Sequence, residues 1–176
     1  MYKYTPPDYL NIDDLLTDEH KIIRSSIRDW VDHSVMPVIE KAAQDHEFPQ
    51  YLFRELGDLG AFGPFIPQEY RSAGLDYISY GVIMTELERG DSRIRSAASV
   101  QTSLVMYPVF RFGSEGQRKK YLPKLATGEM IGCFGLTEPN HGSDPGSMET
   151  KFTYEGFHET YLLIAGMDVT GIGAFG

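Results

Sequence analysis

The first two thirds of the chain carries apolar residues at the spacing of helices that bury one face. In the first such segment they recur three and four residues apart along one stripe, at Ile23, Ile27, Trp30, Val31 and Val35. Thr17 is a candidate N-cap, and the acidic residues after it lie where the helix dipole favours them. Pro37 is expected to end or kink this helix, which then resumes over residues 38–42.

The same spacing predicts three more helices, over residues 50–59, 76–90 and 97–112. The helix over 76–90 is expected to bury a stripe made of Ile78, Val82, Ile83 and Leu87. The helix over 97–112 is expected to be interrupted at Pro108, because proline lacks the N–H that a helix interior needs.

A capping box marks the start of the last helix of this region. Ser114 and Gln117 have the spacing at which each side chain bonds the other residue's backbone N–H. The helix that follows carries several basic residues and is expected to stop near Gly128. Residues 1–129 are therefore predicted to form an all-helical domain.

The pattern changes at the end of this domain. The apolar run over 130–136 is broken by glycines, which is more typical of a strand than of a helix. A loop rich in Gly, Pro, Asn and Ser covers 139–146, and alternating patterns predict strands over 152–155 and 161–165. Two or three strands leave edges unpaired, so residues 130–176 are interpreted as the incomplete start of a β domain. The expected fold class is mainly α.

Composition and charge narrow the classes of function. The formal net charge is −9, which argues against nonspecific binding to nucleic acid. Cys133 is the single cysteine, so neither an intrachain disulfide nor a cysteine zinc site can form, and the five histidines lack metal-ligand spacing. The N-terminus lacks the apolar segment of a signal peptide, and no apolar run approaches the ~18 residues of a membrane span. A soluble cytoplasmic protein without a metal is expected.

The loop over residues 134–144 is the segment most informative about chemistry. Gly135 and Gly142 let the backbone approach a ligand closely, and Thr137 and Ser143 supply hydroxyls. Such a loop can hold a polar heterocycle and a phosphate without a metal. The same residue types also make an ordinary connecting turn, and on spacing alone that alternative is favoured. The glycine spacing is neither that of a Rossmann fingerprint nor that of a P-loop.

Several motifs in order resemble the acyl-CoA dehydrogenase family. The stretch Cys-Phe-Gly-Leu-Thr-Glu-Pro-Asn-His-Gly-Ser-Asp at 133–144 is similar to the flavin-binding signature of that family. Segments similar to its glutaryl-CoA dehydrogenase branch lie at 86–91, 95–101, 113–123 and 145–150. The likeness spans residues 10–156, and several motifs at the right separations are far more specific than one loop.

The resemblance implies a fold, a cofactor and a reaction. The family folds as a helical N-terminal domain, a β-barrel middle domain and a C-terminal four-helix domain. It binds FAD and oxidises the Cα–Cβ bond of an acyl-CoA, with a carboxylate as base and the flavin as hydride acceptor. Electrons pass to an electron-transfer flavoprotein, and members assemble as homotetramers. The glutaryl-CoA branch implies glutaryl-CoA as substrate, with decarboxylation to crotonyl-CoA as an open second step.

The resemblance also assigns roles to residues. Cofactor contacts fall on Phe134, Gly135, Leu136, Thr137, Gly142 and Ser143. Thr137 is expected to bond the pyrimidine edge of the flavin, and His141 departs from the smaller residue expected at its position, so its ring either alters the loop or points to solvent. Substrate contacts fall on Glu88, Arg95, Ser96 and Ser143.

The substrate assignment has a physical reason. A guanidinium binds the distal carboxylate of a glutaryl group bidentately, and Glu88 can orient Arg95 for that contact. Without the resemblance the favoured alternative is an exposed surface pair, because such pairs are common and weak.

The resemblance weakens after Gly156. The family's Trp-Ile-Thr motif has no clear counterpart, since Trp30 is the only tryptophan and Thr170 is a poor match for the threonine. The family's catalytic glutamate belongs to its C-terminal domain, so no catalytic residue is assigned and the chain alone is expected to be an inactive fragment. Two alternatives stay open: a non-catalytic helical remnant that at most pairs with a partner chain, and a dehydrogenase for another short-chain acyl-CoA.

Overall fold

The computed structural model describes residues 9–147 and 149, and the regular structure within them is helical. The α-helices are α1 (Asp18–Trp30), α2 (Ile39–Gln44), α3 (Tyr51–Asp58), α4 (Tyr77–Gly90), α5 (Ser92–Ser99), α6 (Tyr107–Phe112) and α7 (Glu115–Ala126). Two π-helical segments, η2 (Val31–Val35) and η4 (Val100–Met106), and three 3-10 turns, η1 (Ile12–Leu15), η3 (Gln68–Tyr70) and η5 (Pro145–Ser147), complete them. The prediction of a mainly α fold is confirmed.

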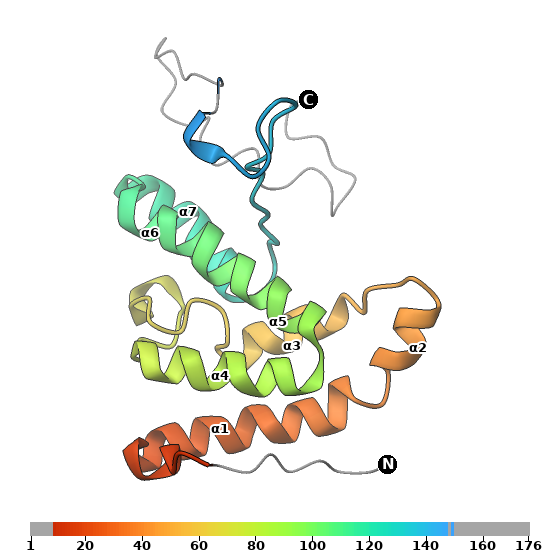
Figure 1. Cartoon of the computed structure of the whole chain (residues 1–176). Helices are drawn as coiled ribbons and strands as arrows, with labels where there is room; N and C mark the ends of the chain where they lie inside the picture. The colour runs from red at the N-terminus through yellow and green to blue at the C-terminus, as the bar shows by residue number, and fades with distance from the viewer. Residues whose placement is uncertain (1–8, 148, 150–176) are drawn as a thin grey trace.

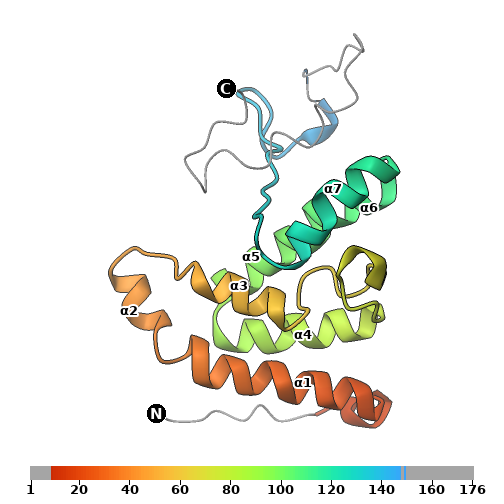
Figure 2. The same ribbon diagram turned by 180° about the vertical axis from the view of Figure 1, so that it is seen from behind.

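Helix α1 lies along α4, as Figure 1 shows and the reverse view in Figure 2 repeats. Its start is fixed by a capping box in which the Thr17 hydroxyl accepts from the His20 N–H, and His20 Nδ1 accepts from the Thr17 N–H, both at 3.2 Å. Its inner face buries Ile27 and continues into η2 through Val31 and Val35. The predicted cap and apolar stripe are therefore confirmed.

The core lies where α1, α3, α4 and the segment from α5 to α6 meet. Its largest fully buried apolar side chains are Phe62, Leu52, Leu56, Ile66, Ile83, Leu87, Ile94, Met106 and Leu122. The prediction that Ile78 of α4 belongs to the buried stripe is wrong, because Ile78 is 52% exposed. The inner face of α4 instead carries two polar residues, Ser79 and Glu86, beside Ile83 and Leu87. The apolar residues of α4 taken alone therefore predict a buried stripe that is too wide.

Helices α5 and α6 form one continuous rod through η4, so the predicted interruption at Pro108 does not occur. The π-helical segment ends at Met106, and Pro108 falls in the first turn of α6. At such a change from π to α hydrogen bonding one backbone position is left without its usual partner, and a residue without an N–H fits there. The proline is accommodated by the π-helical segment.

Residues 131–137 leave the helical part as extended chain beyond α7, seen in Figure 1 where the colour passes from teal to blue. The strand predicted over 130–136 is not formed among the described residues, where the only β pairing is an isolated bridge between Glu138 and His141. Extended backbone becomes a strand only when another segment pairs with it. The strands predicted over 152–155 and 161–165 lie outside the described residues.

Two properties of the described residues bear on the classes of function. None of their helices combines the length and the apolar character needed to cross a membrane. Nor do these residues contain a group of three or more His, Cys, Asp or Glu placed to hold a metal ion.

Candidate functional site

The loop that follows the helical domain is exposed and carries apolar side chains. Phe134 is 50% exposed and Leu136 is 43% exposed, although both are large apolar residues. Thr137, Gly142 and Ser143 are exposed as well. The cofactor residues suggested by the sequence are thus all on one loop and available to a ligand.

A tight turn shapes the far part of this loop. The Glu138 N–H donates to the His141 carbonyl at 3.2 Å, and the His141 N–H donates to the Glu138 carbonyl at 3.0 Å. The Glu138 carboxylate in addition accepts from the backbone N–H of Glu149. The His141 ring, which was expected to alter the loop or point to solvent, is 19% exposed and its Nε2 lies 3.9 Å from a Glu149 carboxylate oxygen. The ring therefore packs within the loop and does not project into solvent.

The other predicted residues lie at the junction of α4 and α5. Asp91 caps α5 by accepting from the N–H groups of Arg93 and Ile94, and its extended backbone turns the chain between the two helices. This turn brings Glu88 and Arg95 together, with Arg95 Nε 2.6 Å from Glu88 Oε2. The suggestion that Glu88 orients Arg95 is consistent with this contact.

Ser92 completes the junction. Its hydroxyl donates to Glu88 Oε1 at 2.6 Å, and this bond, followed by the bond from Arg95, lowers the pKa of Glu88 below its usual value. The side chains of Arg95 and Glu88 are 36% and 48% exposed. Among the described contacts of Arg95, only Nε binds Glu88, so both terminal nitrogens can address a second carboxylate. Ser96 follows on α5 and is half-buried.

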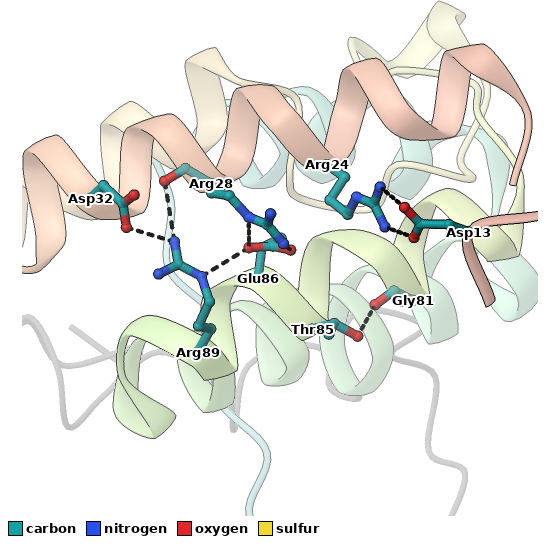
Figure 3. Close-up of polar contacts among 8 residues, drawn as sticks. All are labelled: Asp13, Arg24, Arg28, Asp32, Gly81, Thr85, Glu86 and Arg89. Carbon is teal, nitrogen blue, oxygen red and sulfur yellow. Dashed lines mark hydrogen bonds and ion pairs between the residues drawn. The ribbon is translucent and has the colours of Figure 1, made fainter. Parts of the chain in front are cut away.

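A buried ionic network between α1 and α4 was missed by the sequence analysis (Figure 3). Glu86 is 2% exposed and accepts from Arg28 at 3.0 and 2.5 Å and from Arg89 at 3.0 Å. Arg89 also donates to Asp32 at 2.7 Å. Burial acts to lower the pKa of Arg89, but the bonds to Asp32 and Glu86 outweigh it and raise that pKa.

The signal for this network was present in the sequence. Glu86 lies three residues after Ile83 and one before Leu87, so it falls on the buried face of α4. A carboxylate on an apolar face needs cationic partners, and arginines supply them. The network joins α1 and η2 to α4, the helix that leads into the α4–α5 junction.

These elements define a protein that consists of an all-α domain followed by an exposed loop. Residues 17–129 match the family described as "Acyl-CoA dehydrogenase, N-terminal domain". The chain belongs to the acyl-CoA dehydrogenase family.

Three similar proteins illustrate the relationship. The rat mitochondrial short-chain specific acyl-CoA dehydrogenase is 33% identical over 141 residues, which cover 80% of this chain and 34% of that protein. The crystal structure of glutaryl-CoA dehydrogenase from Mycobacterium smegmatis superposes with a TM-score of 0.78 at 45% identity, over 85% of this chain and 38% of that one. A second structure of a glutaryl-CoA dehydrogenase from that organism, in complex with FADH2, gives a TM-score of 0.77 at 42% identity, over 83% and 38% of the two chains. The chain thus spans about a third of the length of these relatives.

Proposed function

We propose that this chain supplies the helical domain and the flavin-contact loop of an FAD-dependent acyl-CoA dehydrogenase. The observation that carries the proposal is the exposed loop over 134–143, whose Phe134 and Leu136 side chains are 50% and 43% exposed. An isoalloxazine ring system has a large flat apolar surface and a polar pyrimidine edge, and this loop offers groups suited to both. Membership of the family, together with a similar structure in complex with FADH2, supports FAD as that ligand.

Each residue of the loop has a role in this proposal. Phe134, Gly135 and Leu136 lie against the ring system, Thr137 bonds the pyrimidine edge through its hydroxyl, and Gly142 and Ser143 let the backbone approach the cofactor and the thioester arm. FAD, when bound, supplies the hydride acceptor. The protein side chains bind and orient it, and the general base is supplied from outside the described residues.

We further propose glutaryl-CoA as the substrate. Arg95 binds the distal carboxylate through its terminal nitrogens while Glu88 holds Nε, and Ser96 adds a hydroxyl. The 45% identity to a glutaryl-CoA dehydrogenase supports this choice. A substrate with an uncharged short acyl chain is the second candidate, which the likeness to the rat short-chain specific enzyme supports. We also propose that the protein passes electrons to an electron-transfer flavoprotein, assembles as a homotetramer and is located in the cytoplasm.

The first experiment measures flavin binding by the purified chain. Absorbance spectra with and without added FAD are expected to show near-stoichiometric bound flavin. Thr137→Val is expected to weaken FAD binding about tenfold, because a hydrogen bond to the ring is lost. Thr127→Val is the matched control, since the Thr127 hydroxyl bonds carbonyls at the end of α7 and lies outside the loop. A chain that binds no flavin would contradict the proposal and favour a non-catalytic helical module.

The second experiment tests the substrate. The FAD-loaded chain is titrated with glutaryl-CoA and with butyryl-CoA by calorimetry. Arg95→Met is expected to lower the affinity for glutaryl-CoA alone, by about tenfold or more. Arg111→Met, which removes another exposed arginine from the end of α6, is expected to change neither affinity. Equal affinities for the two ligands in both variants would rule out the glutaryl assignment and leave another short-chain acyl-CoA.

A further inference from the structure

Gln101 is a fully buried amide that joins the helical domain to the start of the loop. It lies in η4 and is 0% exposed. Its Nε2 donates to the carbonyls of Leu125 and Met130, at 2.9 and 2.8 Å, and its Oε1 accepts from the Gly132 N–H at 2.8 Å. Both amide hydrogens and the amide oxygen are thereby used by backbone groups.

The partners of Gln101 follow one another along the chain. Leu125 is at the end of α7, where the last carbonyls of a helix have no partner within it. Gly128 turns the chain there with a φ of +67°, and the Met130 N–H returns to the Lys124 carbonyl at 3.0 Å. The Gln101 side chain therefore binds the end of α7 and two positions, Met130 and Gly132, of the segment that follows it.

Gly132 is held against the same π-helical segment by close packing. A Cβ at Gly132 would lie 2.4 Å from Val105 Cγ1 and 2.8 Å from Cγ2. Real side chains do not approach that closely, so the backbone here contacts the rod at a distance that only glycine allows. The amide of Gln101 and the side chain of Val105 thus hold Gly132 from two directions.

We infer that Gln101 is a positioning residue for the loop over 134–143, an inference that rests on the proposed flavin contact of that loop. Phe134 begins the loop two residues after Gly132, so a shift of Gly132 moves the first group that faces the flavin. Gln101 does not belong to the loop, and it acts on the cofactor through Met130 and Gly132. Its three bonds set where the loop begins relative to the helical domain.

A neighbouring residue gives a matched control for a purely structural role. Thr102 is also 0% exposed and its hydroxyl accepts from the Gly63 N–H at 3.1 Å. It therefore makes the same kind of buried bond from side chain to backbone, in the same π-helical segment, to a connector away from the loop. Thr102→Val and Gln101→Met both remove buried bonds, but only Gln101→Met releases the loop.

Cys133 provides a probe that does not depend on flavin. It is the only cysteine of the chain, is half-buried, and directly follows Gly132. The rate at which its thiol reacts with DTNB under native conditions reports how often this segment opens. Gln101→Met is expected to raise the DTNB reaction rate about tenfold and to lower the affinity for FAD about tenfold. Thr102→Val is expected to change the rate and the affinity by less than about twofold.

A second route disturbs the same contact without touching Gln101, in case the methionine variant does not fold. Gly132→Ala forces the segment away from Val105 and is expected to raise the DTNB rate and weaken FAD in the same way. Adding Val105→Ala removes both γ carbons and is expected to restore a large part of both properties. Rescue by the second change would locate the effect at the position of the loop and not at overall stability.

The outcomes separate this inference from the proposed function. An unchanged DTNB rate in both Gln101→Met and Gly132→Ala overturns the positioning role. A loss of FAD affinity in Gln101→Met that is no larger than the loss in Thr102→Val overturns it as well. If the unsubstituted chain binds no FAD, the proposed function fails for this chain. The Cys133 rate then still decides whether Gln101 holds the segment, and an increase confined to Gln101→Met and Gly132→Ala supports it.

Discussion

Arg28 on α1 and Glu86 on α4 are joined by two hydrogen bonds, from Nε at 3.0 Å and from Nη2 at 2.5 Å, although 58 residues separate them in sequence. The Glu86 side chain is 3% exposed and that of Arg28 is 35% exposed, so the carboxylate is inside the protein while the guanidinium reaches the surface. This pair, with Arg89, connects α1 and α4, the two longest α-helices of the described residues (Figure 3). Glu88, a proposed substrate residue, follows Glu86 by two residues on α4.

Glu86→Gln is expected to destabilise the protein by about 3 kcal/mol, because Arg28 and Arg89 lose their shared carboxylate inside the protein. Urea unfolding followed by circular dichroism measures the change. Glu88→Gln, two residues along the same helix, is the control: its side chain is 48% exposed, and its loss is expected to leave the urea midpoint nearly unchanged. Equal losses from the two variants would mean that the buried network contributes no more than a surface pair.

The lowered pKa of Asp76 predicts how the stability of the protein depends on pH. It caps α4 by accepting from the Ser79 N–H at 2.7 Å and also binds His20 Nε2 at 3.0 Å; these bonds, Ser79 first, lower its pKa from 3.8 to about 2. A pKa that is lower in the folded state favours folding above the unfolded value of 3.8, and this contribution is lost as pH falls toward about 2.

The stability loss in that window is therefore expected to be smaller in Asp76→Asn, by about 1 kcal/mol, a figure reduced for solvent screening because the side chain is 54% exposed. Urea midpoints between pH 5 and pH 2 test the prediction. Asp58→Asn, which removes another exposed carboxylate, serves as control. An unchanged pH profile in Asp76→Asn would show that the bond from Ser79 does not favour the charged form.

Two glycines of α4 are predicted to respond in opposite directions to alanine. A Cβ added at Gly81 would have no atom within 4 Å, so Gly81→Ala is expected to stabilise the protein by about 0.8 kcal/mol through helix propensity. At Gly90 a Cβ would lie 2.5 Å from Val31 Cγ1, so Gly90→Ala is expected to cost about 2 kcal/mol. Thermal unfolding compares the two variants, and a shift of both in the same direction would contradict the contact between α4 and η2.

The local signals of the sequence were read correctly where their partners are close in the chain. Thr17 and Ser114, the two caps predicted from the sequence, each accept a hydrogen bond from the backbone N–H three residues on. The contacts predicted between Glu88 and Arg95 belong to the same class, since the two residues are seven apart. The proposed flavin role of the loop came from its resemblance to a family, because turn residues alone do not distinguish a ligand loop from a connector.

The amino-acid sequence by itself determined where α1 and α7 begin, because caps and apolar spacing act within one or two turns. It placed the start of the helix over 97–112 too late, since α5 begins at Ser92. Only the tertiary structure decided which polar residues are buried and what they bind. Glu86 is buried because Arg28, 58 residues earlier, lies opposite it. Gln101 holds Gly132, 31 residues later, because α7 returns the chain to the rod, and no local pattern records such a return. Ile78 is exposed for the same reason, since the partners of α4 lie on its other side.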